Sequence, residues 1–463
     1  MDPALIGEIL AGLMFFAIIG VLMLGFPVAF TLAGVSLIFA GLGWAAGTFD
    51  FSTFSSLAPR YMGIMLNDVL VAVPLFIFMG MMLERSGIAE QLLITMGRLF
   101  GALRGGLGIS VIIVGALLAA STGIVGATVV TMGLLSLPAM LRAGYDPKLA
   151  TGVICASGTL GQIIPPSTIL IFMGDMLGSM NAQVQMAKGN FAPQVVSVGN
   201  LFAGAFIPGL ILVGVYISFV IWKAVRDPAS CPALVVTPEE KRALLRDILV
   251  SMIPTLALIV AVLGSILGGI ATPTESASVG AVGAMLLALA RGRLTWTNLR
   301  SVMDSTATTT CMIFIILIGA SVFGLVFRML GGERLVHDLL AAMPGERVGA
   351  IVFVMLLMFV LGFILDTFEI IFVIIPITAP VLFFLDVDPV WLGVLIAVNL
   401  QTSFLTPPFG FSLFYLRSVA PRTVRTPMIY RGALPFVGLQ IAVIGALIAF
   451  PGLATWLPRL IYG

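Results

Sequence analysis

Two pairs of adjacent prolines interrupt apolar stretches of this sequence, and small or polar residues precede each pair. Pro165 and Pro166 follow the segment 157–164, and Pro407 and Pro408 follow 399–406. Proline lacks an N–H and clashes with the preceding turn, so two adjacent prolines unwind a helix. Unwinding frees carbonyl groups that can coordinate a cation such as Na⁺, and the new helix N-terminus favours an anion. The pattern therefore predicts two ion-binding breaks. A pair of packing kinks is the simpler alternative.

Acidic residues in apolar surroundings form a second group of candidates. Asp366 and Glu369 interrupt an apolar segment, where a carboxylate is costly and points to function. We expect Asp366 to accept hydrogen bonds from substrate hydroxyls or to help hold a cation, whereas Glu369 shares such a role, pairs locally or is protonated. Glu275 has a structural explanation, because Thr272-Pro273-Thr274-Glu275 reads as a helix capping box. Asp146 and Asp388 each precede a proline, and turn initiation explains them.

The elements that must position these residues are membrane helices. The chain is 60% hydrophobic and 10% charged, with a mean hydropathy of +1.17, whereas about a quarter of the residues of a soluble domain are charged. Apolar runs near 20 residues recur, each long enough to cross a bilayer. We therefore predict an all-α polytopic protein of the lipid bilayer.

Several other classes find no support in the residues. The three cysteines have no metal-site or redox spacing, and the single histidine, His337, cannot build a metal centre. No basic cluster coincides with aromatic residues, so no nucleic-acid partner is expected. HExxH and GxSxG motifs are missing from the sequence, which leaves an intramembrane enzyme without support.

A pattern of prolines, aspartates and glycines occurs twice along the chain. Five residues recur at an offset of 242, which are Pro138, Asp146, Pro147, Pro165 and Pro166 in the first copy and Pro380, Asp388, Pro389, Pro407 and Pro408 in the second. Upstream glycines and prolines recur at offsets of 244 and 246. Duplicated interrupted helices indicate the binding site of a transporter. We predict repeat one at 1–222, a cytoplasmic linker at 223–247 and repeat two at 248–463.

Each repeat is predicted to contain about five transmembrane helices. The expected spans are 5–24, 27–46, 69–84, 148–173 and 199–222 in repeat one, and 248–268, 273–290, 308–330, 390–416 and 435–455 in repeat two. The helices at 148–173 and 390–416 are the broken ones. An odd number of crossings per repeat makes the two copies run in opposite directions, which predicts inverted-topology repeats.

Two apolar segments do not fit as single spans. Residues 106–141 and 349–384 are each 36 residues long, about 54 Å as one helix. Their centres carry Ser121-Thr122-Gly123 and Asp366-Thr367, so we predict re-entrant helical hairpins whose tips supply carbonyls and hydroxyls. Two ordinary spans joined by a tight turn remain the alternative. Amphipathic segments precede both hairpins, at 86–101 and 332–343, and are read as interfacial arm helices, with plain connecting helices as the alternative.

The distribution of basic residues predicts the orientation. With the N-terminus outside, 17 of the 23 Lys and Arg residues fall on the inner side, as the positive-inside rule requires. Both termini are then outside, with ten crossings and two hairpins. No Lys or Arg lies deep in a predicted span, so an anionic substrate has to be met by helix N-termini, hydroxyls and bound cations. This argues for obligatory cation coupling.

At these motifs the chain resembles the large membrane subunit (DctM-like, M subunit) of tripartite ATP-independent periplasmic (TRAP) transporters, in the ion-transporter superfamily. The resemblance rests on four segments: 138–145, 161–167, 272–275 and 399–410. It implies an elevator-type secondary transporter in the bacterial inner membrane that imports an organic acid with Na⁺. It also implies two partners, a periplasmic substrate-binding protein and a small four-helix membrane subunit, here expected as a separate chain.

The resemblance also assigns site residues. Substrate contacts are expected from Ser121, Thr122, Ser157, Ser167, Asp366, Thr367 and Gln401. Na⁺ is expected at Ser121, Gly123, Gly158, Gly161, Asp366, Thr402 and Thr406, mostly through backbone carbonyls. The expected substrate is a keto acid, a dicarboxylate or a related small carboxylate. A stand-alone Na⁺/carboxylate symporter is the closest rival, and a channel is a further one.

Overall fold

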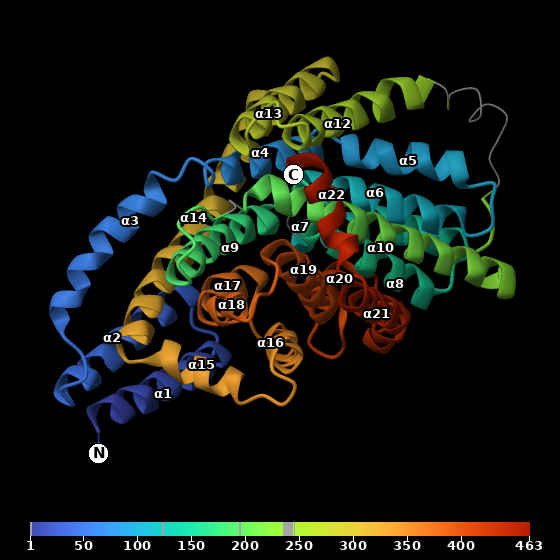
Figure 1. Cartoon of the computed structure of the whole chain (residues 1–463). Coiled ribbons are helices and arrows are strands. Elements are labelled where there is room, and N and C mark those ends of the chain that lie inside the picture. The colour runs from blue at the N-terminus through green and yellow to red at the C-terminus, as the bar shows by residue number, and fades with distance from the viewer. Residues whose placement is uncertain (1, 123–124, 194–195, 235–243, 245) are drawn as a thin grey trace.

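Helices make up every regular element in the part of the chain that the computed structural model describes (Figure 1). That part comprises residues 2–122, 125–193, 196–234, 244 and 246–463, with the backbone alone at 119–122 and 251. Eight helices are long and apolar enough to cross a membrane, or up to ten if each of two bent pairs counts as one span. The prediction of an all-α polytopic membrane protein is confirmed.

The first half of the chain contains α1 Pro3–Met23, α2 Val28–Ala45, η1 Phe51–Ser56, α3 Leu57–Met65, α4 Ala72–Arg85, α5 Ile88–Phe100, α6 Gly106–Thr122, α7 Val125–Arg142, α8 Pro147–Thr159, η2 Leu160–Gln162, α9 Thr168–Ala187 and α10 Val198–Arg226. The second half contains η3 Pro228–Ser230, η4 Ile248–Met252 (a π-helical turn), α12 Ile253–Leu267, α13 Pro273–Ala290, α14 Trp296–Met329, α15 Gly332–Ala341, α16 Arg347–Leu361, α17 Thr367–Val373, α18 Ile375–Phe384, α19 Pro389–Leu405, α20 Phe411–Val419, α21 Thr426–Ala449 and α22 Gly452–Tyr462.

Several boundaries differ from the predicted spans. The second limb of the first broken helix, α9, continues to Ala187 instead of ending at 173, and α14 begins at Trp296 instead of 308. The predicted span 435–455 is wrong at both ends, since α21 covers Thr426–Ala449 and a separate helix, α22, follows. Hydropathy locates the apolar part of a helix, and a helix can continue beyond it into polar surroundings. The short helices α3 and α22 were not predicted.

Local sequence signals fix many helix starts. Asp146 and Asp388 cap α8 and α19 by accepting the N–H of Lys148 and of Val390, and a proline occupies the first turn in both helices. The predicted capping box at Thr272 is confirmed at the start of α13. The carboxylate of Glu275 accepts the N–H of Thr272 at 2.8 Å and its hydroxyl at 3.0 Å, which suits a carboxylate at a helix N-terminus.

The helices form two packing groups. In the first, the scaffold group, α2 packs on α1 and α14, α4 packs on α13 and α14, and α12 lies beside α13. In the second, the hairpin group, α8 packs against α6, α7 and α21, and α10 packs against α9, α19, α21 and α22. In Figure 1, α1 and α2 lie at the lower left and α8, α10 and α21 at the right.

Two helices outside the breaks and hairpins, α10 and α21, pack with them. Glycines explain the close packing of α21 on α8, because a Cβ added to Gly152 would lie 2.1 Å from the carbonyl oxygen of Gly432. Small residues of this kind let membrane helices approach along their backbones.

Helices α5 and α15 correspond to the predicted arms and connect the two groups. Each begins after a glycine in the left-handed region, Gly87 at φ 72° and Gly331 at φ 85°, where a side chain would be strained. The chain bends by 61° between α4 and α5. Two ion pairs hold α15, Arg328 with Glu333 and Arg334 with Glu8, and both are 2.7 Å long. These contacts attach the second arm to α14 and α1 of the scaffold group.

Candidate functional site

The first broken helix is interrupted between α8 and α9. Because Pro165 and Pro166 have no N–H, the carbonyls of Gly161 and Gln162 lose their helical donors. The carbonyl of Gln162 instead accepts the hydroxyl of Ser167 at 3.3 Å. All of the residues from Gly161 to Thr168 except Ile164 are buried. The predicted break is therefore present, and it lies inside the protein.

In the second broken helix, a serine hydroxyl again donates to a carbonyl that has lost its helical donor. Pro407 and Pro408 remove the usual helical donors of the carbonyls of Ser403 and Phe404. The carbonyl of Ser403 accepts the N–H of Thr406 at 3.1 Å, and that of Phe404 accepts the hydroxyl of Ser412 at 2.7 Å. Phe404 lies 242 residues after Gln162, so the two serine-capped carbonyls are equivalent positions of the proposed repeats. The peptide bond between the two prolines is cis in both breaks.

The first break meets the tip of the second hairpin. The side-chain amide of Gln162 donates a hydrogen bond to the hydroxyl of Thr367, with 3.0 Å between Nε2 and Oγ1, and both residues are buried. Thr367 is the first residue of α17, directly after the tip that separates α16 from α17. The structure thus brings together one predicted substrate residue and the break in the other repeat.

The first hairpin packs closely against the first broken helix. A Cβ added to Gly115 of α6 would lie 2.6 Å from Cβ of Ser157, and a Cβ added to Gly158 would lie 2.3 Å from Cγ2 of Val129 in α7. The hydroxyl of Ser157 donates to the carbonyl of Ile154 within its own helix. Gly158, predicted as a cation ligand, thus has a packing role in the structure.

The second hairpin contacts the second broken helix in an equivalent manner. A Cβ on Gly362, at the end of α16, would lie 2.1 Å from the hydroxyl oxygen of Ser403, and the amide of Asn399 donates to the carbonyl of Met355 at 2.8 Å. Thr402 and Thr406 turn their hydroxyls toward carbonyls one turn back, at 2.7 Å each. Their hydroxyls are therefore engaged within the helix.

The two acids sit at the start of α17. Glu369 is buried, and its carboxylate accepts the N–H of Asp366 at 3.1 Å, which gives Glu369 a local capping role. No Lys or Arg of the described residues forms an ion pair with either acid. Asp366 is therefore a carboxylate without a permanent counter-charge, which suits a group that binds a cation in a transport cycle.

Tyr415 of α20 is a site residue that the sequence analysis missed. Its ring lies 3.1 Å from where a Cβ on Gly126, near the start of α7, would stand. Tyr415 thus packs against the beginning of α7, as α20 does along its length. Its signal in the sequence is its position seven residues after the double proline, and surrounding aromatic residues hide it.

Gln401 lies apart from the hairpin tips. Its amide donates to the hydroxyl of Tyr216 in α10 at 3.2 Å, and the amide of Gln440 in α21 donates to the same hydroxyl at 2.7 Å. All three side chains are fully buried. This cluster connects the second broken helix to α10 and α21, which helps to explain why these helices belong to the hairpin group.

Oxygen atoms suited to a hard cation are present beside the first break. The Oε1 atom of Gln162 is buried without a hydrogen-bond partner, and the carbonyl of Gly161 has lost its helical donor. Among the described residues, no group of three or more His, Cys, Asp or Glu could hold a metal ion. The available ligands are thus carbonyl, amide and carboxylate oxygens, the kind that hard cations prefer. Of the other predicted residues, Gly123 lies outside the described residues, as do the side chains of Ser121 and Thr122.

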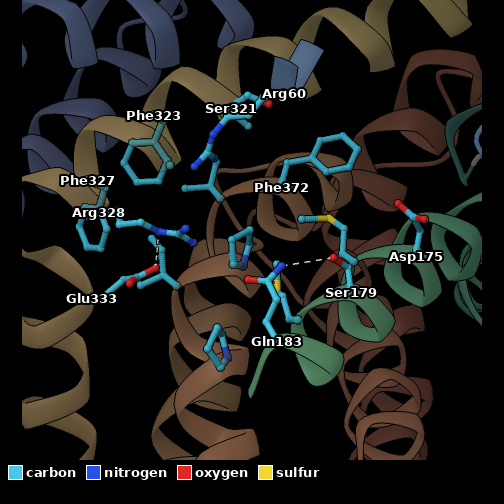
Figure 2. A pocket seen from close by; sticks show the side chains of 18 of the residues that line it. Arg60, Asp175, Ser179, Gln183, Ser321, Phe323, Phe327, Arg328, Glu333 and Phe372 are labelled. Carbon is cyan, nitrogen blue, oxygen red and sulfur yellow. Dashed lines mark hydrogen bonds and ion pairs between the residues drawn. The ribbon is translucent and has the colours of Figure 1, made fainter. Parts of the chain in front are cut away.

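A cavity of about 920 Å³ lies between the two packing groups. Its walls come from α3, α14 and α15 on one side and from α9, α17 and α18 on the other, at the end of the molecule predicted to face outward (Figure 2). None of the described site residues predicted from the sequence lines it. Phe172 and Phe372, which do, stack edge-to-face at 5.1 Å, and Phe172 also contacts Phe368 at 5.8 Å. Phe368, the neighbour of Thr367 in the chain, thus contacts a ring that lines the cavity.

Known membrane transport proteins resemble this chain in fold and in sequence. The chain has a TM-score of 0.61 with the crystal structure of the YdaH transporter of Alcanivorax borkumensis, at 16% identity, over 87% of this chain and 89% of that one. That likeness concerns the fold. Residues 15–453 match the family model described as "Tripartite ATP-independent periplasmic transporter, DctM component", and the chain belongs to this family.

Relatives in this family carry different substrates in their names. The chain is 29% identical to the C4-dicarboxylate TRAP transporter large permease protein DctM of Vibrio cholerae, over 97% of this chain and 98% of the relative. It is 28% identical to the ectoine TRAP transporter large permease protein TeaC of Halomonas elongata, over 96% and 98%. These findings confirm the resemblance drawn from the motifs. The chain is a large permease component of a tripartite transporter.

Proposed function

We propose that this chain catalyses Na⁺-coupled import of a small organic acid across a bacterial inner membrane. A keto acid, a dicarboxylate or a related carboxylate fits the site best, since hydroxyls, amides and helix N-termini surround the breaks and an anion needs such donors. The relative named for C4-dicarboxylates supports this class. The relative named for ectoine shows that similarity near 28% does not select a substrate.

The observation that carries the proposal is the contact between Gln162 and Thr367. It joins the break of one repeat to the hairpin tip of the other, as a binding site shared between inverted repeats requires. Substrate bound there can bridge the two repeats. Asp366 supplies a carboxylate beside this contact, and unpaired oxygens at Gln162 and Gly161 supply further cation ligands.

The cation has a definite role in this proposal. Among the residues that the structure describes, no Lys or Arg pairs with the acids of the site, so Na⁺ bound at Asp366 and at the broken helices supplies the positive charge that a carboxylate substrate needs. Substrate without Na⁺ meets too little positive potential to bind, and Na⁺ without substrate leaves the site incomplete. Transport of one is thereby coupled to transport of the other.

The two packing groups suggest how the site crosses the bilayer. The hairpin group carries both breaks and both hairpins, and the arms α5 and α15 connect it to the scaffold group. We propose that the hairpin group slides relative to the scaffold group in an elevator motion. A periplasmic substrate-binding protein delivers the acid at the outer face, and a small four-helix membrane subunit supports the scaffold.

Uptake into proteoliposomes tests this function. The vesicles contain the chain with its small subunit, and the binding protein is added outside with radiolabelled succinate, pyruvate or related acids. We expect uptake of one such acid that requires both an inward Na⁺ gradient and the binding protein. Equal uptake without the binding protein identifies a stand-alone symporter, and uptake independent of Na⁺ contradicts the cation assignment. Flux that does not saturate indicates a channel.

A further inference from the structure

Three arginines and two acids line the cavity between the two packing groups: Arg60, Arg328 and Arg334 with Asp175 and Glu333. Glu333 pairs with Arg328 at 2.7 Å, and Glu8, which is not part of the lining, pairs with Arg334 at the same distance. Asp175 accepts the amide of Asn67, a neutral group, at 2.9 Å. These ion pairs neutralise Arg328 and Arg334 and leave Arg60.

Arg60 is the arginine available to a ligand. Arg334 pairs with Glu8, whereas Arg60 has no ion-pair partner within the part of the chain that the structure describes. Burial and the nearby guanidinium of Arg328 lower the pKa of Arg60. The charged form of Arg60 is thus held at some cost, and an anion placed beside Arg60 and Arg328 removes that cost. A planar guanidinium also matches a carboxylate in two-point hydrogen bonding.

The rest of the cavity suits an organic acid rather than a bare inorganic ion. In Figure 2, Phe323 and Phe327 of α14 lie on one side with Arg328, and Ser179 and Gln183 of α9 lie on the other. Phe372 of α17 also lines the cavity and lies above Ser179 in this view. Aromatic walls with a few polar groups are usual for sites that bind small organic ligands.

We propose that this cavity is an entry site where a carboxylate binds between Arg60 and Arg328 before it reaches the breaks. This inference rests on the proposed function for the identity of the anion and adds a second, outer binding site to it. Phe172 and Phe372 line the entry site and contact Phe368, the residue next to Thr367, whereas Thr367 itself is not part of the lining. A substrate therefore waits outside the hairpin tip until the hairpin group moves.

Charge-selective labelling of a cysteine in the cavity tests the proposal without measuring transport. Ser321 lines the cavity and is replaced by cysteine in a Cys311→Ser background, because Cys155 and Cys231 are buried. The full chain is reconstituted in phosphatidylcholine vesicles. Rates of reaction are measured with an anionic and a cationic methanethiosulfonate. Ser55→Cys, on the exposed η1 segment, is the matched control.

We expect the ratio of anionic to cationic labelling rates at Ser321→Cys to exceed the control ratio about tenfold, as one uncompensated charge about 6 Å away predicts in water. Arg60→Gln should lower this ratio to the control value, whereas Arg60→Lys should keep the raised ratio. Succinate slows labelling at Ser321→Cys but not at Ser55→Cys. The control rate at Ser55→Cys, measured in the same Arg60 variants, reports whether they retain the fold.

Three results overturn the proposal. Equal ratios at the two cysteines would show that the cavity has no positive potential. An unchanged ratio in Arg60→Gln would show that Arg60 is not its source. If phosphatidylglycerol in the vesicles slows labelling at Ser321→Cys and succinate does not, the cavity binds a lipid headgroup instead of an organic acid. Because none of these readouts involves uptake, a negative result here leaves the proposed transport function standing, and failure of uptake leaves this inference standing.

Discussion

Gln162 donates its side-chain amide to the hydroxyl of Thr367 at 3.0 Å, across 205 residues of sequence. One partner belongs to a helix broken by two prolines, and the other begins the returning limb of a hairpin in the opposite half of the chain. Neither side chain has another side-chain partner among the described residues, and Oε1 of the glutamine is left unpaired. The contact therefore holds the two halves together while leaving an oxygen for a ligand.

Removing this hydrogen bond should impair transport. Thr367→Val keeps the shape of the side chain but leaves the amide of Gln162 buried without an acceptor, which costs about 1–3 kcal/mol. We expect kcat/KM for uptake to fall roughly tenfold in Thr367→Val. Thr367→Ser, which retains the hydroxyl, is the control and should stay near the wild-type value. Equal uptake by the valine and serine variants contradicts a role for this bond.

Close packing at Gly158 should limit which side chains it tolerates. In Gly158→Ala the new methyl group meets Val129 of the first hairpin at 2.3 Å, and we expect a loss of about 1–3 kcal/mol in stability from overpacking. Val129→Ala should restore part of the melting temperature in the double variant. Gly438→Ala, at a glycine with nothing within 4 Å, is the control. An unchanged melting temperature in Gly158→Ala would contradict close packing at this glycine.

The two acids of the second hairpin should differ in their effects. Asp366→Asn removes the charge proposed to hold Na⁺, so the Na⁺ concentration for half-maximal uptake should rise at least tenfold, about 1.4 kcal/mol. Glu369→Gln keeps an oxygen that can accept the N–H of Asp366, and its effect should be several-fold smaller. Titration of uptake against Na⁺ measures both. A larger effect of Glu369→Gln than of Asp366→Asn would indicate that Glu369 holds the cation.

The pH dependence of stability should reveal the pair formed by Asp386 and Lys188. A hydrogen bond from Lys188, 2.6 Å away, lowers the pKa of Asp386 below its usual value. A lowered folded-state pKa stabilises the protein above the unfolded value near 3.9, and this contribution is lost as the pH falls through the folded pKa. The difference in melting temperature between wild type and Asp386→Asn should thus be present at pH 6 and shrink toward pH 3. A difference that grows on acidification contradicts the assignment.

The sequence predicts those features that rest on a local cause. Two adjacent prolines must break a helix whatever surrounds them, so both breaks are found where they were predicted. The caps at Asp146, Asp388 and Thr272 likewise depend on residues three positions apart or fewer. Apolar runs locate membrane helices because hydrocarbon admits little else.

Other features depend on contacts between distant residues and leave little trace in the sequence. Tyr415 is one aromatic residue among many until α20 folds against α7 of the first hairpin. Arg60 resembles a loop arginine until α3 brings it beside Arg328. Packing of α10 and α21 with the hairpins follows from the fit of Gly152 against Gly432 and from the cluster around Tyr216, and no periodicity encodes either. The inverted relation of the repeats and the role of Asp366 stay predictions.

Cross-linking across the two packing groups tests the central claim that the hairpin group moves relative to the scaffold group. Asn67, which precedes α4, and Asp175 of α9 are joined by a 2.9 Å hydrogen bond, so a cysteine pair at these positions can be bridged by a short bifunctional thiol reagent. A pair at Lys188 and Asp386, both in the hairpin group, is the control. Bridging 67 to 175 should abolish uptake until the link is reduced, whereas bridging 188 to 386 should not. Undiminished uptake with 67 and 175 linked would contradict the elevator account.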